Sequence, residues 1–307
     1  MNPSFISLDW GTSSLRATLV SAEGRIIEAR NAAGGVMSVK DRQFEASLHA
    51  ICSDWIDQFG CPIVASGMIG SRQGWVEAPY LDCPATPAAA ARAFTTLSIS
   101  NKVEMHIIPG LRCGSAASMY DVMRGEETQI WGADVEPGSL CVLPGTHSKW
   151  AFVGEQSTIT RFATYMTGEL YGLLTKHGIL GRLMEFGVKD NEAFARGATL
   201  GLNHPSHATH VLFAARTAGL MGEEHPAALP DYLSGILIGL EVASALITEN
   251  VDGERPIVLI GDDDLCCRYE VALQLAGLQS VRARDAATIQ GHVRVAREAG
   301  IVVCESA

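Results

Sequence analysis

The 307-residue sequence predicts an α/β fold made of two similar domains. Three observations support it. Strand-like apolar runs separated by Gly and Ser turns open the chain, a second group of this kind begins near residue 139, and a short apolar run at 257–260 ends in Gly-Asp before a helix. Because duplication of one strand–turn unit implies two domains of one design, we expect the two to face each other.

The first group begins with an apolar run that ends in the carboxylate of Asp9. After Trp-Gly-Thr-Ser-Ser, further runs cover 15–20 and 25–30, which predicts a three-stranded antiparallel meander. Gly11 allows a sharp turn whose following N–H groups can face an anion. A carboxylate beside such a turn is favourable when a divalent cation lies between it and a phosphate. The alternative is a polar hairpin tip that binds nothing.

The second group repeats this pattern. Aligning Gly11 with Gly145 superposes the phrase Gly-Thr-x-Ser in both turns, and each turn follows an apolar run. Leu143 stands where the first copy has Asp9, so the second turn offers no metal-binding acid. It offers instead a phosphate grip with its own positive charge, from Thr146, His147, Ser148 and Lys149.

Between the two groups lies a loop rich in glycine and hydrogen-bond donors. Apolar spacing predicts a helix over 44–59, ended by Gly60, and then a short buried strand over 62–65. The loop 66–75 follows that strand, where α/β sheets commonly bind ligands. Its polar groups and Trp75 suit a polyhydroxylated or carboxylated small molecule, although a plain surface loop remains the alternative.

The remaining patterns complete the α/β alternation. Thr167 is a candidate N-cap, and Glu126 and Glu127 lie on a predicted helix whose two acids cannot share one face. Near its end the chain offers Gly261 beside Asp262, which suits either a ligand or a helix cap. The predicted elements are a helix before residue 93, a strand over 105–109, helices over 119–131 and from 166, a broken helical stretch over 180–221, a long apolar helix over 231–250, a strand over 257–260 and a last helix over 286–299.

Composition narrows the classes of function. Hydrophobic residues make up 47% and charged residues 19%, so a large core is expected. A net charge of -11 argues against a nucleic-acid partner but allows a site for one nucleotide. The start of the chain does not have the pattern of a signal peptide, and the apolar stretch 232–247 is interrupted by polar residues, so we expect no membrane partner. Eight cysteines without a CxxC pair favour buried thiols in a cytoplasmic protein.

Five phrases together resemble the 2-dehydro-3-deoxygalactonokinase family, within the superfamily of sugar kinases, heat-shock protein 70 and actin. They occupy residues 8–13, 66–75, 124–129, 143–150 and 166–170. The resemblance spans nearly the whole chain and is weakest over 180–225.

The resemblance implies two RNase H-like domains, as in actin-like ATPases, that flank a central cleft. It places an N-terminal domain at 1–118 and a C-terminal domain at 119–307, with the last helix, about 286–300, returning toward the first. It also implies a kinase that transfers phosphate from ATP, with Mg²⁺, to the 6-hydroxyl of 2-dehydro-3-deoxy-D-galactonate, a sugar acid of galactonate catabolism.

Roles carried over from the resemblance are expectations. Asp9 would hold the metal, and Glu126, in preference to Glu127, would accept the proton of the sugar hydroxyl. Gly132 and Gly291 would allow two helices to approach closely and act as hinge contacts. ATP would be held by Gly11, Thr12, Ser13, Arg16, Gly145, Thr146, His147, Ser148, Lys149, Gly261 and Asp262. The sugar acid would be held by Ser71, Arg72, Gln73, Trp75, Thr167 and Glu169, with the Arg72 guanidinium on its carboxylate.

Two other functions share some of these features. A phosphohydrolase of the exopolyphosphatase type has the paired Glu residues and the fold, but it has no use for the loop at 72–75. A non-catalytic sugar or nucleotide sensor would normally carry a DNA-binding segment, which the acidic composition does not supply. The residues leave the epimer preference and the oligomeric state open.

Overall fold

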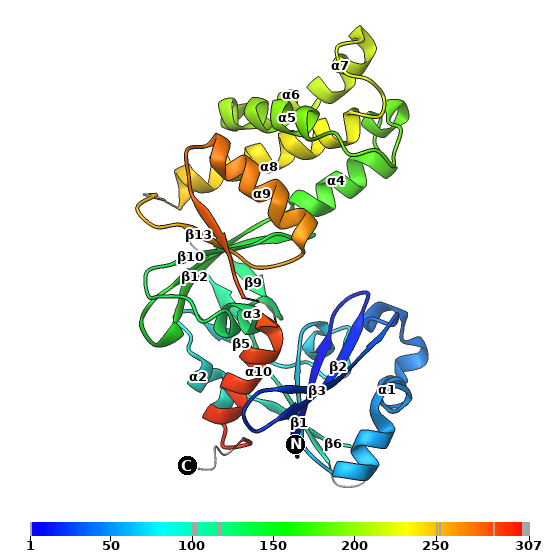
Figure 1. The fold of residues 1–307 in the computed structure, drawn as a ribbon, viewed down its shortest axis with the longest axis vertical. Coiled ribbons are helices and arrows are strands. Elements are labelled where there is room, and N and C mark those ends of the chain that lie inside the picture. The colour runs from blue at the N-terminus through cyan, green and yellow to red at the C-terminus, as the bar shows by residue number, and fades with distance from the viewer. Residues whose placement is uncertain are drawn as a thin grey trace. The chain divides into compact units, whose positions relative to one another are not determined.

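The computed structural model describes residues 2–99, 103–115, 118–249, 251, 253–284 and 286–302. It is a mixed α/β structure whose described strands form three sheets. The chain divides into two compact units (Figure 1). Unit 1 comprises Met1–Gly138, Phe152–Phe162 and Ala283–Ala307, and unit 2 comprises Ser139–Ala151 and Ala163–Arg282. The predicted domain boundary after residue 118 stays a prediction.

Unit 1 is built on a six-stranded sheet of order β3-β2-β1-β4-β7-β6. The first three strands are antiparallel neighbours, which confirms the predicted meander. β1 pairs in parallel with β4, and β4 with β7, so the carboxyl ends of these three strands lie at one edge. The strands are β1 (Pro3–Trp10), β2 (Leu15–Ser21), β3 (Ile26–Ala32), β4 (Ile63–Ser66), β6 (Thr95–Ser98) and β7 (Glu104–Ile107).

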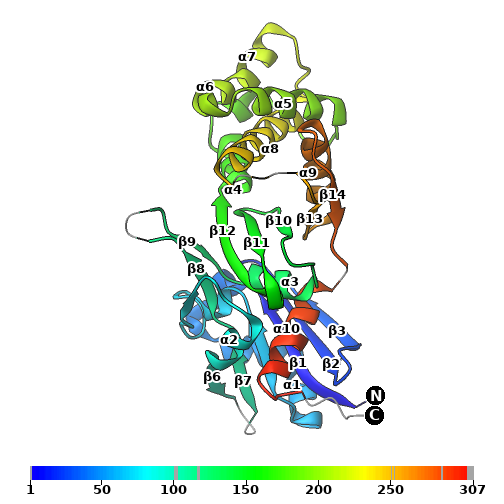
Figure 2. The same cartoon turned by 90° about the vertical axis from the view of Figure 1, so that its left-hand side faces the viewer.

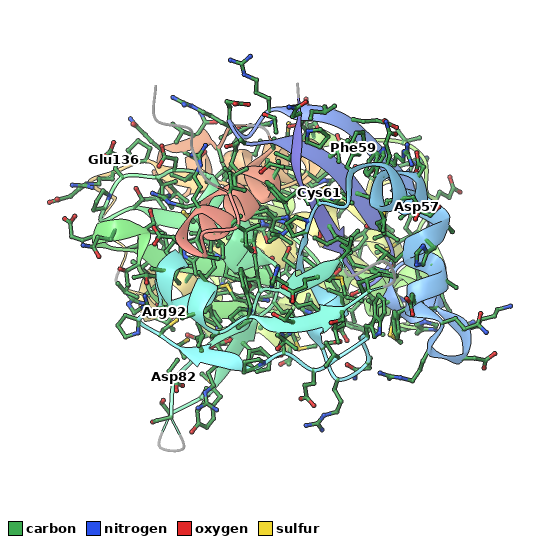
Figure 3. The ribbon with its side chains drawn as sticks, turned by 90° about the horizontal axis from the view of Figure 1, so that it is seen from below. Asp57, Phe59, Cys61, Asp82, Arg92 and Glu136 are labelled. Atoms are coloured by element: carbon green, nitrogen blue, oxygen red, sulfur yellow. The ribbon has the colours of Figure 1, made fainter. Side chains whose placement is uncertain are left out.

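One helix of unit 1 matches its prediction at both ends. α1 (Phe44–Phe59) buries Phe44, Leu48 and Trp55 in the core beside β1 and β2, and it ends at Gly60 in the left-handed conformation. Asp57 and Phe59 lie near that end (Figure 3). The short helix α2 (Pro87–Arg92) carries Arg92, also labelled there.

The prediction of one helix over 119–131 is wrong. Residues Asp121–Met123 form β9, which pairs with β8 (Gly110–Cys113) in a small sheet completed by β5 (Tyr80–Asp82). The helix α3 (Glu126–Gly132) begins only after Gly125, whose φ of 110° lies outside the helical region. Helical spacing in the sequence therefore hid a strand and a sharp turn.

α3 packs against α10 (Ala287–Glu298), the last described helix of unit 1. A Cβ built on Gly132 would lie 1.8 Å from the Ala287 carbonyl oxygen, and one on Gly291 would lie 1.9 Å from that of Thr128. The predicted close approach of the two helices at these glycines is confirmed. Their role as hinge contacts stays a prediction.

Unit 2 contains most of a five-stranded sheet of order β12-β11-β10-β13-β14, which can be followed in Figure 2. The second predicted group of strands is present as β10 (Leu140–Leu143), β11 (Ser148–Val153) and β12 (Ile159–Tyr165). β13 (Ile257–Leu259) and β14 (Ser280–Arg282) complete the sheet in parallel. The chain passes between the two units within β11 and β12.

Helices cover unit 2, and the longest of them is its core. They are α4 (Thr167–Lys176), α5 (Asn191–Asn203), α6 (Ala208–Leu212), α7 (Ala214–Met221), α8 (Leu229–Thr248) and α9 (Asp263–Leu275). By length and apolar composition α8 alone among the described helices would be able to cross a membrane. However, 61% of its most apolar 18-residue stretch is buried inside the protein. It packs against α4, α5 and α9, as the core helix of a globular unit does (Figure 2).

Candidate active site

The first candidate half-site is the turn between β1 and β2 in unit 1. Trp10 Nε1 donates to the Gly34 carbonyl at 3.1 Å, and the Val36 N–H donates to the carbonyl of Gly11 at 3.0 Å. The turn is therefore fixed from behind by residues 34–37. In the described part of the chain the N–H groups of Thr12 and Ser13 have no hydrogen-bond partner, so they are available to an anion.

Asp9 lies at the end of β1, directly opposite Arg16 on β2. The Arg16 Nη1 lies 3.4 Å from Asp9 Oδ2, but the Arg16 side chain is 61% exposed. Burial raises the pKa of Asp9, and the Arg16 charge opposes that rise. On the other side Asp9 is paired in the sheet with Ser66, whose buried Oγ has no hydrogen-bond partner. Asp9 is thus a partly desolvated carboxylate with a weak, exposed counter-charge.

Two glycines bring α3 to Asp9. Gly67, with φ of 90°, comes directly after β4 and lies against the end of β1. A Cβ on Gly67 would lie 2.9 Å from the Trp10 carbonyl oxygen and 3.6 Å from Asp9 Oδ1. A Cβ on Gly125 would in turn lie 3.3 Å from the Cα of Gly67. The three segments are therefore stacked backbone to backbone, so α3 begins beside the end of β1.

The two acids at the start of α3 differ in environment. Glu127 is fully buried and accepts the Gly125 N–H with both oxygens, at 2.9 and 2.7 Å, and the Thr128 hydroxyl at 3.1 Å. Burial and the neighbouring Glu126 charge raise the pKa of Glu127 to about 7. Glu126 is half-buried and accepts the Arg124 N–H at 3.0 Å. The prediction that the two acids do not share one face is confirmed.

The loop after β4 separates its predicted ligand residues. Arg72 is 83% exposed and lies 3.6 Å from Glu77, and Gln73 is exposed as well. Trp75 instead packs into the core, stacked on Phe44 at 6.1 Å between ring centroids. Ser71 is 7% exposed, and its hydroxyl has no partner.

The second candidate half-site is the turn between β10 and β11, in unit 2. Thr146 and His147 are exposed at its tip, and the His147 Nε2 pairs with the carboxylate of Glu169 on α4. The Glu169 N–H donates to the Thr146 carbonyl at 3.0 Å, so the turn is fixed to the first turn of α4. Lys149 is buried, and its Nζ donates to the carbonyl of His147 at 3.0 Å. This turn therefore has an internal cation beneath its tip.

Ser148 does not reach the tip. It is fully buried, and its hydroxyl lies 2.7 Å from that of Tyr269 on α9. Tyr269 donates to Glu241 on α8 at 2.6 Å, and Trp150 Nε1 donates to the other oxygen of Glu241 at 2.8 Å. Burial raises the pKa of Glu241, while donors that include the Thr167 hydroxyl oppose that rise. The prediction that Thr167 is an N-cap is wrong, since Met166 holds that position and the Thr167 side chain turns to Glu241.

Beside this network lies a cavity of about 170 Å³ in unit 2. It runs from the turn to α8 and α9, and its lining includes Gly145, Gly168, Ser234, Leu237, Leu265 and Arg268. Asp262 is not among its lining residues. Asp262 caps α9 by accepting the N–H groups of Asp264 and Leu265, at 2.9 and 3.4 Å.

Sequence reasoning missed the buried members of the second half-site. Glu241 carried a signal, because it is the one carboxylate in the apolar run over 232–247 that becomes the core of α8. Tyr269 carried none, since its partner Glu241 lies far away in the chain. Among the described residues no cluster of three or more His, Cys, Asp or Glu side chains forms a metal site.

Comparisons with known proteins identify relatives of this chain. The profile of the 2-keto-3-deoxy-galactonokinase family matches residues 9–295. The chain is 35% identical to the 2-dehydro-3-deoxygalactonokinase of Escherichia coli K12 over 295 residues, which cover 96% of this chain and 97% of that protein. The crystal structure of a candidate 2-dehydro-3-deoxygalactonokinase from Sinorhizobium meliloti superposes with a TM-score of 0.86 at 33% identity, covering 95% of this chain and 98% of that one.

A more distant structure bears on the fold alone. The activator of 2-hydroxyisocaproyl-CoA dehydratase from Clostridium difficile superposes with a TM-score of 0.51 at 10% identity, over 96% of this chain and 93% of that one. The predicted fold class, an α/β fold of the actin-like ATPase type, is confirmed. The predicted enzyme class, a phosphotransferase with an alcohol acceptor that uses ATP, is confirmed as well. The chain belongs to the 2-keto-3-deoxy-galactonokinase family.

Proposed function

We propose that the chain transfers the γ-phosphoryl group of ATP to the 6-hydroxyl of 2-dehydro-3-deoxy-D-galactonate, in the cytoplasm, as a step of galactonate catabolism. The relatives that share 35% of its residues support this substrate. The observation that supports it in the structure is the stacking of the residue 9–10 backbone, Gly67 and Gly125, which brings the carboxylate of Asp9, a turn with unpartnered N–H groups and the start of α3 close together.

Asp9 is proposed to hold Mg²⁺ through the ion's water molecules. The residues fit such an ion, because a single carboxylate with unpartnered hydrogen-bonding groups around it suits a cation that keeps most of its waters. Bound there, Mg²⁺ would neutralise charge on the phosphates. The unpartnered Ser66 hydroxyl, on the residue paired with Asp9 in the sheet, would hold one of the waters. The N–H groups of Thr12 and Ser13 would bind phosphate oxygens.

Glu126 is the proposed acceptor of the proton from the sugar hydroxyl. It is half-buried and able to contact a substrate. Glu127, in contrast, is fully buried, and its oxygens accept hydrogen bonds from Gly125 and Thr128. As the sugar oxygen bonds to the γ-phosphorus, its proton passes to Glu126 and the bond to ADP breaks. Glu127 would then fix the backbone at Gly125 and so orient the side chain of Glu126.

The nucleotide is proposed to use the turn and cavity of unit 2. The N–H groups of the exposed residues Thr146 and His147 would meet phosphate oxygens, with Lys149 supplying positive charge beneath them. The cavity beside Gly145 has apolar walls from Leu237 and Leu265 and polar groups from Ser234 and Arg268, which suit a purine and its ribose. Gly261 and Asp262 would border this region without entering the cavity.

ATP consumption measured with and without the sugar acid tests the proposal. We expect ADP to form only when 2-dehydro-3-deoxygalactonate is present and the phosphate to appear on its O6, which phosphorus NMR of the product identifies. Phosphate release that is independent of the sugar would favour the hydrolase. Absence of turnover with any 2-keto-3-deoxy acid would exclude the kinase assignment.

A further inference from the structure

Buried side-chain atoms without a hydrogen-bond partner gather at one place in unit 1. Seven such atoms occur among the described residues, and four of them belong to Ser66, Ser71 and Arg124. Leaving a buried donor unpaired costs about 1–3 kcal/mol, and more when it is charged, so such groups are normally satisfied. Their concentration beside a predicted ligand loop indicates a place where a bound ligand would supply the hydrogen-bond acceptor.

Arg124 is the charged member of this group. Its Nη2 donates to the Ala78 carbonyl at 2.8 Å, and its guanidinium lies 4.4 Å from the ring centroid of Tyr80. Its Nε and Nη1 are buried without a partner, and none of the ion pairs found in the described part of the chain includes it. Arg124 is therefore held in position by two contacts, with two donors left over.

One of the two unpaired donors, Nη1, lies against the loop after β4. A Cβ built on Gly70 would lie 3.0 Å from Arg124 Nη1, so the guanidinium edge lies against Gly70. The next residue, Ser71, is 7% exposed with an unpartnered hydroxyl. The exposed Arg72 points away from this place, toward Glu77. An unpaired guanidinium edge therefore lies beside the short segment that carries the unpaired Ser71 hydroxyl.

We propose that Arg124, with Ser71, binds the carboxylate of the sugar acid and makes the enzyme specific for acids over neutral sugars. The proposal rests on the proposed function, because it assigns the carboxylate end of that substrate. A guanidinium that offers two N–H groups matches a carboxylate in charge and in spacing. Because the unpaired donors of Arg124 and Ser71 are buried, Gly70 and Ser71 must shift slightly to let the carboxylate reach them. Arg72, exposed and beside Glu77, would contribute little.

The test compares the sugar acid with its carboxamide, which has the same shape without the charge. For the wild type, R124K, S71A and R72K, kcat/KM is measured with both compounds at saturating ATP. We expect the wild type to prefer the acid. R124K and S71A should lose this preference through a raised KM for the acid, by roughly 10- to 150-fold for the charged group and less for the hydroxyl. R72K should keep it.

Ser71→Ala keeps the test decisive if R124K fails to fold. Its hydroxyl has no partner, so its removal should not lower stability, and a purely structural role predicts no change in KM. Thr164→Val is the matched control, since it removes another buried, unpartnered hydroxyl, on β12. Its preference for the acid should equal that of the wild type. An unchanged preference in both S71A and R124K would overturn the proposal.

Binding without ATP separates the two proposals. Calorimetric titration of the wild type and S71A with the sugar acid and the carboxamide needs no turnover. If the acid binds the wild type better than the amide, and S71A abolishes this, the carboxylate site stands even when no phosphate is transferred. If the acid turns over but the wild type binds both compounds equally, the kinase stands and the carboxylate site does not.

Discussion

The phenol of Tyr269 donates a 2.6 Å hydrogen bond to the carboxylate of Glu241, in the interior of unit 2. The same phenol oxygen lies 2.7 Å from Ser148, the residue that ends the second candidate phosphate turn. A buried carboxylate surrounded by neutral donors thus connects α8, α9 and the start of β11. The shape of the turn therefore depends on an acid that lies in the interior of the unit, behind the turn.

Glu241→Gln should disturb this turn. The amide NH₂ would meet the Trp150 or Tyr269 donor instead of accepting from it, so we expect a loss of about 1–3 kcal/mol in unfolding free energy. KM for ATP should rise more than KM for the sugar acid. Urea unfolding and steady-state kinetics measure both effects. Glu192→Gln, on a 93% exposed side chain of α5, is the control and should change neither. Equal rises of both KM values would contradict this role.

Asp9→Asn should remove the charge that is proposed to hold the metal, without changing the size of the side chain. We expect kcat to fall by roughly 10²–10³, because charge neutralisation at the phosphates dominates phosphoryl transfer. Binding of the sugar acid, measured by calorimetry, should stay at the wild-type level. The Mg²⁺ concentration needed for half-maximal rate should also increase. A variant with normal turnover would show that Asp9 does not hold the metal.

Glu126→Gln should lower kcat by about 10²–10⁴ and leave KM for the sugar acid nearly unchanged, as loss of a proton acceptor does. Glu127→Gln should act through the fold, because one amide group would then oppose the Gly125 N–H. Its unfolding midpoint should drop while kcat falls less than in E126Q. A kcat defect confined to Glu127→Gln would move the role of base to that residue.

His292 should make the protein sensitive to acid. It is fully buried on α10, its Nδ1 lies 2.6 Å from Ser7 Oγ, and burial lowers its pKa from 6.5 to about 3. The His292 side chain of the unfolded chain therefore takes up a proton near pH 6.5, whereas that of the native chain stays neutral until about pH 3. The free energy of unfolding is therefore fully present above pH 6.5 and declines as the pH falls toward 3. Urea unfolding between pH 4 and 7 should show a shallower decline in His292→Asn. The exposed His177→Asn should keep the wild-type slope.

Gly132→Ala should separate α3 from α10. The new methyl would meet the Ala287 carbonyl at 1.8 Å, a backbone atom that cannot rotate away. We expect destabilisation of about 1–3 kcal/mol or more. Gly172→Ala on α4 meets nothing within 4 Å and should raise stability by roughly 0.5–1 kcal/mol. Thermal unfolding of the two variants compares a tight and an open glycine directly, and equal midpoints would contradict the packing.

The parts of the fold that follow local pattern could be predicted from the sequence. The apolar period of α1 and its Gly60 end, and the two Gly-Thr turns with their strands, depend on neighbouring residues and were confirmed. The helix over 119–131 was wrong because pairing of β9 with β8 overrode the local spacing. Ser148 and Trp75 had the right chemistry for a ligand, but burial turned their side chains into the interior. No local pattern reports on such long-range packing.

Gly70 limits how the loop after β4 could be re-engineered. Its missing side chain leaves room for Arg124, Ile107 and Ala78, so any larger residue would displace the buried guanidinium. Arg72 and Gln73, exposed two and three residues further on, are free of such packing. A directed-evolution library aimed at new acceptors should therefore randomise 72 and 73 and keep 70 constant. The variants should then differ in affinity for acceptors with different hydroxyl arrangements, while they keep the proposed preference for a carboxylate.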